Sequence, residues 1–238
     1  MTLMTSPRIG KRSAPAWTLA RLARRFGSIP IDRIRLNPKP GSARKEDVLA
    51  IHDRENRLCE LYDGVLVEKT VGFHEAYLAS EIAAILRSYI KPRNLGIVLA
   101  DGGMIEILKD QVRIPDVSFI SWRSLPDRTY PDEPIPAIVP DLAVEILSPS
   151  NSVVEMRRKL DEYRESGVKL VWYVDPKSES VRVWNLAAGQ TEPTILGRDA
   201  TLDGGDVLPG FSISLAELFA KPKAPAAEPK SPAIEPIP

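Results

Sequence analysis

The chain has 238 residues, and 32 Lys and Arg residues balance 32 Asp and Glu residues, so the formal net charge is zero. This balance excludes an overall electrostatic attraction to nucleic acid, so such binding would need local basic patches. The single cysteine, Cys59, excludes an intrachain disulfide and a cysteine-based zinc site, which fits a cytoplasmic protein. No apolar run approaches the roughly 20 residues of a membrane span.

The two ends of the chain differ from its middle in composition. Residues 1–45 are rich in Arg and Lys and contain one acid, Asp32. We interpret them as a basic, poorly ordered extension in which Trp17–Phe26 has the pattern of a short amphipathic helix. A nucleic-acid-binding arm and an organelle transit peptide are the alternatives. Residues 221–238 are rich in proline, which predicts a disordered tail, so one folded domain is expected at residues 46–220.

Alternating helices and strands are predicted within this domain. Leu58–Glu68 has the pattern of a β-hairpin with Asp63-Gly64 as its turn. Apolar residues at three- and four-residue spacing predict a helix over His74–Ile90, ended by Pro92 and Gly96. Three strands are expected next, at Ile97–Leu99, Met104–Leu108 and Val117–Ile120.

The second half of the domain continues the alternation. Asp141–Leu147 has the composition of a buried strand, and Ser152–Ser166 that of a helix closed by Gly167. Shorter elements follow at Leu170–Val174, Val181–Trp184, Thr201–Leu208, Phe211–Ile213 and Leu215–Phe219. This order indicates an α/β fold with mixed strand pairing.

Two acids stand out against this background. Asp116 follows a proline and opens an apolar strand, where the rigid backbone could hold a metal ligand. Glu145 lies within the apolar run DLAVEIL, and a buried carboxylate is normally paired or bound to a metal. The alternative for Glu145 is a salt bridge to a buried Arg or Lys. With only two histidines in the chain, a metal site would consist mainly of carboxylates, which favours hard ions such as Mg²⁺.

A loop and a helix after Glu145 carry the third candidate. In the loop Ser148–Ser152, Asn151 or Ser152 can cap the next helix, and the loop returns the chain to the end of the sheet where the acids lie. Lys159 is adjacent to the apolar side of that helix and can face the sheet. A solvated surface lysine is the alternative.

The motifs ELYDG (residues 60–64), RIPDVSFISW (113–122), DLAVEILSPSNS (141–152) and LVWYVDP (170–176), with Lys159, Tyr163 and Gly167 between them, occur in one characteristic order. In this order and spacing the chain resembles the Uma-type restriction endonuclease family of the PD-(D/E)xK nuclease superfamily, over roughly residues 55–219. The resemblance implies a restriction-endonuclease-like mixed central sheet flanked by helices, with an N-terminal hairpin and extra C-terminal strands.

The resemblance also implies roles for individual residues. Asp116 and Glu145 match the two metal-binding acids. The usual lysine of the superfamily lies two residues after the glutamate, where this chain has Leu147, and Lys159 on the following helix matches the lysine of this family. An upstream acid completes such sites, and Glu60, Glu68 and Glu75 are the candidates, of which we favour Glu68. His74 lies where many members carry a histidine.

These roles imply an endonuclease that uses Mg²⁺ or Mn²⁺ to hydrolyse phosphodiester bonds of double-stranded DNA. The resemblance suggests a homodimer, and the apolar strand Leu170–Val174 with Trp172 and Trp184 favours one. The alternative is a catalytically inactive nucleic-acid- or protein-binding module on a nuclease scaffold, and a hydrolase acting on another phosphoester is a third interpretation. Replacement of Lys159 with Met is expected to reduce activity and to leave the fold intact.

Overall fold

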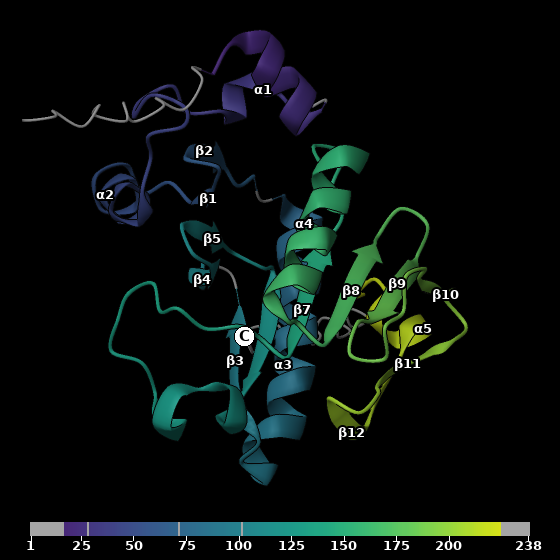
Figure 1. Ribbon diagram of the computed structural model, residues 1–238. Helices are drawn as coiled ribbons and strands as arrows, with labels where there is room; N and C mark the ends of the chain where they lie inside the picture. Colours follow the sequence, from purple (N-terminus) through teal and green to yellow (C-terminus); the bar gives the residue numbers. More distant parts are fainter. Residues whose placement is uncertain (1–16, 28, 71, 101, 225–238) are drawn as a thin grey trace, which may run out of the picture.

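The computed structural model describes residues 17–27, 29–70, 72–100 and 102–224 (Figure 1). They form a large mixed sheet, a smaller antiparallel sheet and a two-stranded sheet, with helices packed against them. This α/β arrangement confirms the predicted fold class. Among the described residues, no helix combines the length and apolar character that crossing a membrane requires.

The large sheet has six strands in the order β10-β9-β8-β7-β6-β3. Only β7 and β8 are parallel, because helix α4 carries the chain back between them, and every other neighbouring pair is antiparallel. The bounds are β3 Gly96–Ala100, β6 Val117–Ser121, β7 Leu142–Ile146, α4 Val153–Ser166, β8 Leu170–Asp175, β9 Ser180–Asn185 and β10 Thr194–Leu196.

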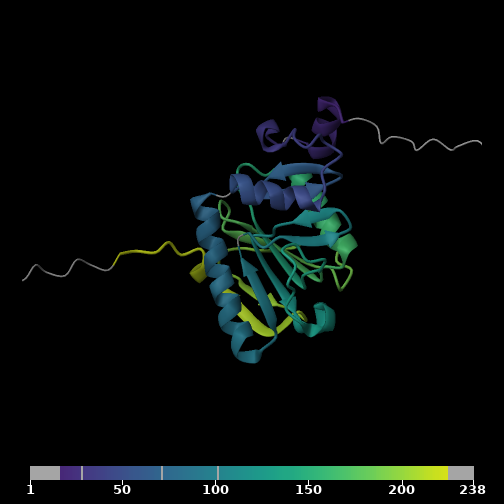
Figure 2. The ribbon, with the colours of Figure 1, turned by 90° about the vertical axis from the view of Figure 1, so that its left-hand side faces the viewer.

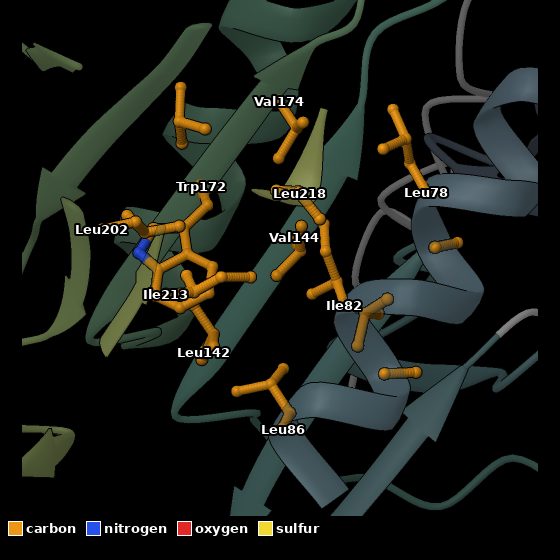
Figure 3. Close-up of a cluster of buried hydrophobic side chains, with 14 of the residues drawn as sticks. Leu78, Ile82, Leu86, Leu142, Val144, Trp172, Val174, Leu202, Ile213 and Leu218 are labelled. Atoms are coloured by element: carbon orange, nitrogen blue, oxygen red, sulfur yellow. The ribbon is translucent and has the colours of Figure 1, made fainter. Parts of the chain in front are cut away.

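Helix α3 (Phe73–Arg93) covers one face of the large sheet, as Figure 2 shows. Leu78, Ile82 and Leu86 recur every four residues along the side of the helix that faces the sheet. Figure 3 shows them against side chains of β7, β8 and the C-terminal segments: Leu142, Val144, Trp172, Val174, Leu202, Ile213 and Leu218. Those C-terminal segments are β11 (Thr201–Gly204), β12 (Leu208–Ser214) and α5 (Leu215–Leu218).

Helix α4 covers the opposite face. Its residues Met156, Leu160 and Tyr163 pack on residues of β8 that alternate with those facing α3, among them Val171 and Tyr173. Both faces of β8 are therefore covered within one chain, and Trp172 and Trp184 are buried. The apolar character of this strand has an internal cause and does not by itself indicate a partner chain.

The small sheet has the order β2-β1-β5-β4 and packs against helix α2. Its strands are β1 Cys59–Tyr62, β2 Val65–Glu68, β4 Ile105–Leu108 and β5 Gln111–Arg113, and α2 spans Lys45–Glu55. Asp63 and Gly64 both have positive φ, as the predicted two-residue hairpin turn requires. Because only residues 114–116 separate β5 from β6, Asp116 lies where the chain passes from the small sheet to the large one.

Some element boundaries differ from the prediction. Helix α3 continues through Pro92 and ends at Asn94, which adopts a left-handed conformation. A proline in the last turn removes one backbone donor without ending the helix. Helix α2 and the short strands β5 and β10 were not predicted from the sequence, and three-residue helices occur at η1 Ile31–Arg33, η2 Trp122–Ser124 and η3 Pro126–Arg128.

The N-terminal segment packs closely against the domain. Helix α1 (Leu19–Phe26) buries Leu22 and Phe26, and the chain after it buries Ile29 and Ile34 against the β1–β2 hairpin. We expected residues 1–45 to make few contacts, but in the described residues 17–27 and 29–45 apolar side chains interleaved with the basic ones form a small core. Residues 1–16 and the tail from 225 to 238 lie outside the described residues.

Candidate active site

The register of β6 and β7 brings the two predicted acids together. Val117 pairs with Val144 in antiparallel fashion, so the preceding Asp116 and the following Glu145 come next in the register, on the side of the sheet that faces α4. Directly opposite residues have Cβ atoms about 4.5–5.5 Å apart. One Asp116 carboxylate oxygen accepts a hydrogen bond from the Ile146 backbone N–H at 2.6 Å. Both carboxylates line one cavity of about 20 Å³.

Helix α4 directs Lys159 toward these acids. The Lys159 Nζ lies 3.1 and 3.0 Å from the two Glu145 carboxylate oxygens and 3.0 Å from Glu60 Oε1. One turn later, the Tyr163 hydroxyl donates to Glu145 Oε1 at 2.5 Å. Lys159 is 4% exposed, so it is not a surface lysine. Glu145 thus has the buried cationic partner that a structural role alone would require, and it also shares a cavity with Asp116.

Of the three candidate upstream acids, Glu60 and Glu75 line the cavity, and Glu68, which we favoured, does not. Cys59 pairs with Glu68 across the hairpin, so these two residues share one face, and Glu60 points to the other. Glu68 instead binds Arg35 and Arg57 at 2.8 and 2.9 Å, away from the cavity. Glu75, from the first turn of α3, lines the cavity beside Glu60.

A second lysine, Lys69, was missed by the sequence reasoning. Its Nζ lies 2.8 Å from Asp116 Oδ1 and donates to the Ile114 carbonyl at 2.6 Å. The register of the β1–β2 hairpin shows that Lys69 lies on the same face as Glu60. Val67 pairs with Glu60, and alternation along the chain directs Lys69, two residues later, to the same face.

A buried ion network supports Glu60 from behind. Arg113, fully buried, donates to Glu60 at 3.0 Å and to Glu162 of α4 at 2.7 Å. Arg158 lies 3.5 Å from the other Glu162 oxygen. Since buried charges are stable only with partners, this network fixes α4 against the small sheet.

The charges at the site perturb one another. Burial raises the pKa of Glu145, and although Lys159 opposes this, the nearby Asp116 and Glu60 carboxylates keep it above its ordinary value. Burial also tends to raise the pKa of Glu60, but Lys159 and Arg113 outweigh it and lower the pKa to about 2. Burial tends to lower the pKa of Lys159, but Glu145 and Glu60 raise it above its usual range. Lys159 therefore remains an ammonium, and Glu145 is protonated more easily than Glu60.

The donor set is compatible with one Mg²⁺ or Mn²⁺ ion. Mg²⁺ is usually held by one or two protein carboxylates, with water and phosphate as the other ligands, and Asp116 and Glu145 supply two. The cavity of about 20 Å³ has room for one water-sized species. Among the described residues, no group of three or more His, Cys, Asp or Glu side chains is arranged to hold a metal ion. Lys69 would have to release Asp116 Oδ1 for the ion to use that oxygen.

An open groove adjoins this cavity. It has a volume of about 1160 Å³ and shares Glu75, Ser148 and Asn151 with the cavity wall. It runs past the first turns of α3 and α4, where Phe73 is exposed and His74 forms part of the wall. His74 therefore lies beside the route to the carboxylates and does not line the small cavity itself.

Comparisons with known proteins identify the family and support the fold. Residues 46–216 match the family model Uma2, described as "Putative restriction endonuclease". Curated proteins provide no match. A solved structure, "a putative nuclease belonging to DUF820 from Anabaena variabilis ATCC 29413", superposes with a TM-score of 0.60 at 22% identity, over 68% of this chain and 89% of the other, and supports the fold. Since the family model spans most of the chain, the protein belongs to the Uma2 family.

Proposed function

We propose that the chain is an endonuclease that hydrolyses phosphodiester bonds of double-stranded DNA with Mg²⁺ or Mn²⁺ held by Asp116 and Glu145. The observation that carries the proposal is the convergence of these two acids and Lys159 on one cavity. Asp116 lies just before β6, Glu145 on β7 and Lys159 on α4, and membership of a family described as "Putative restriction endonuclease" supports a nuclease role for the three residues.

Each side chain at the site has a separate role in this proposal. Asp116 and Glu145 supply oxygen ligands, and the Tyr163 hydroxyl fixes one Glu145 oxygen. When bound, the cation polarises the phosphate and lowers the pKa of water. Lys159 orients the attacking water and offsets the charge that develops on the phosphate. Glu60 also binds the Lys159 ammonium, at 3.0 Å.

The alternative is a catalytically inactive module that binds nucleic acid or protein. The ion pair between Lys69 and Asp116 is the observation that favours it, because it neutralises an acid that the active enzyme needs for the cation. In an active enzyme the Lys69 ammonium would have to release Asp116 Oδ1 for a cation to use that oxygen. In the inactive module the pair is permanent.

Cleavage assays test the proposal. Purified protein is incubated with plasmid, linear duplex, single-stranded DNA and RNA, each with Mg²⁺, Mn²⁺ or a chelator. Plasmid and linear duplex should be cut only with a cation. Glu145→Gln, which keeps the Tyr163 hydrogen bond, should reduce the rate about a hundredfold or more. Lys45→Met removes a peripheral ion pair with Glu106 and should cleave like the wild type. No cleavage of any substrate with either ion would favour the inactive module.

A homodimer and a cytoplasmic location complete the proposal. Two copies would present one site to each strand of a duplex, which is the reason to expect a dimer of a DNA endonuclease. The lone thiol, Cys59, is buried and free, as suits a reducing compartment. Sedimentation velocity at micromolar concentration should show the dimer, and a monomer there would contradict it.

A further inference from the structure

Arg33 reaches the candidate site from outside the residues that match the family. The family model begins at residue 46, whereas Arg33 ends the short helix η1 of the N-terminal segment. Its side chain is buried, with 7% exposed, and lines the same cavity as Asp116 and Glu145. Such burial of an arginine requires a reason, because its five donors need acceptors.

The guanidinium joins three parts of the chain. Its Nε donates to the Glu68 carbonyl at 2.9 Å, at the end of β2. One terminal nitrogen donates to the Ser150 carbonyl at 3.1 Å. Both terminal nitrogens bind the Glu155 carboxylate, at 2.9 and 3.3 Å. This bidentate ion pair is the arrangement in which a guanidinium binds a carboxylate most strongly.

The partners of Arg33 control the connection between the site residues. Glu155 lies in the first turn of α4 and forms a capping box with Ser152. The loop before it, which includes Ser150, joins the strand that carries Glu145 to the helix that carries Lys159. The Ser150 hydroxyl also bonds Thr70 and Ser148, at 2.8 Å each. Arg33 therefore holds the middle of the loop and the first turn of α4, between Glu145 on β7 and Lys159 on α4.

We propose that Arg33 is a positioning residue of the active site, so that the catalytic unit of this chain includes the N-terminal segment before residue 46. Arg33 acts through the Ser148–Ser152 loop and the first turn of α4, and it does not take part in the chemistry itself. The consequence for cleavage rests on the proposed nuclease function. The consequence for the order of the loop does not.

The experiment measures hydrogen exchange in the full-length wild type, Arg33→Met, Arg33→Lys and Arg35→Met. Arg35 is the matched control, because it comes from the same segment but binds Glu55 and Glu68, neither of which lines the cavity. In Arg33→Met, amides of residues 147–157 should exchange about tenfold faster or more, while those of β7 and β8 keep their protection. Arg33→Lys keeps a charge that can bind Glu155 and should fall in between. Arg35→Met should match the wild type in this loop.

Cleavage kinetics provide the second measurement. Where the wild type cuts DNA, Arg33→Met should lower kcat about tenfold or more with little change in KM, and Arg33→Lys should recover part of it. Where the wild type cuts nothing, the nuclease proposal fails and the exchange result still decides the role of Arg33 in ordering the loop. Unchanged exchange in residues 147–157 would overturn the inference. Equally faster amide exchange across the whole domain in both Arg33 variants would also overturn it, since Arg33 would then stabilise the whole fold and not this loop in particular.

Discussion

Replacement of Lys159 with Met tests the electrostatics of the site directly. The ammonium lies between two carboxylates that are 3–4% exposed, those of Glu60 and Glu145. Methionine keeps much of the packing of the side chain but removes its charge. From the sequence we expected this variant to leave the fold intact. Given the burial, we now expect a loss of stability, because the Glu60 and Glu145 carboxylates would each lose a partner.

The expected loss of stability follows from the geometry. Removing one partner of a buried ion pair costs about 3–5 kcal/mol, and Glu60 keeps Arg113 as a second partner, so most of the cost falls on Glu145. Lys159 lowers the pKa of Glu145, and without it that pKa rises further above the ordinary value of 4.5. An acid whose pKa is higher in the folded state stabilises the fold below its unfolded pKa and loses that contribution as pH rises through the folded value. Relative to the wild type, the variant should therefore lose more of its free energy of unfolding at about pH 8 than at about pH 5.

Urea unfolding followed by tryptophan fluorescence measures this effect, since Trp172 and Trp184 are buried in the core. Lys45→Met provides the control for loss of an ordinary lysine. The double variant Glu145→Gln/Lys159→Met should recover much of the lost stability, because it removes the unpaired charge as well. A loss below about 1 kcal/mol that does not vary with pH would refute the reasoning, as it would mean that Lys159 and Glu145 do not interact strongly in solution.

Two further predictions concern single groups at the site. Because Lys159 and Arg113 lower the pKa of Glu60 from 4.5 to about 2, its ionised form contributes about 3 kcal/mol of stability above pH 4.5, which is lost as pH falls toward 2. Glu60→Gln should lower the free energy of unfolding at neutral pH, and that free energy should then fall less steeply between pH 4.5 and 2 than in the wild type. An equally steep fall in the variant would contradict this. In calorimetric titrations with Mn²⁺, Asp116→Asn should weaken binding about tenfold or more, Lys69→Met should strengthen it by freeing Asp116, and Glu68→Gln should have no effect. Weaker binding in the Lys69 variant would mean that this lysine supports the cation site.

The sequence by itself determined most of the local elements and the fold class. The Asp63-Gly64 turn, the apolar period along α3 and the Ser152 cap of α4 depend on neighbours within a few residues, and each element formed as expected. The convergence of Asp116, Glu145 and Lys159 also followed from the sequence, through the order of family motifs. Their separate patterns allowed a salt bridge or a surface lysine equally well.

Only the tertiary structure decided which other charges join these three. Glu60 lines the cavity and Glu68 does not, because the register of a hairpin assigns each residue to one face, and no local pattern distinguishes two acids in strands buried on both sides. Arg33 binds Glu155, which lies more than a hundred residues later in the chain, and Lys69, just after β2 of the small sheet, binds Asp116, just before β6 of the large sheet. Apolar periodicity follows from a repeating backbone geometry, whereas an ion pair depends on where two distant side chains end, which is settled only when the sheets and helices pack together.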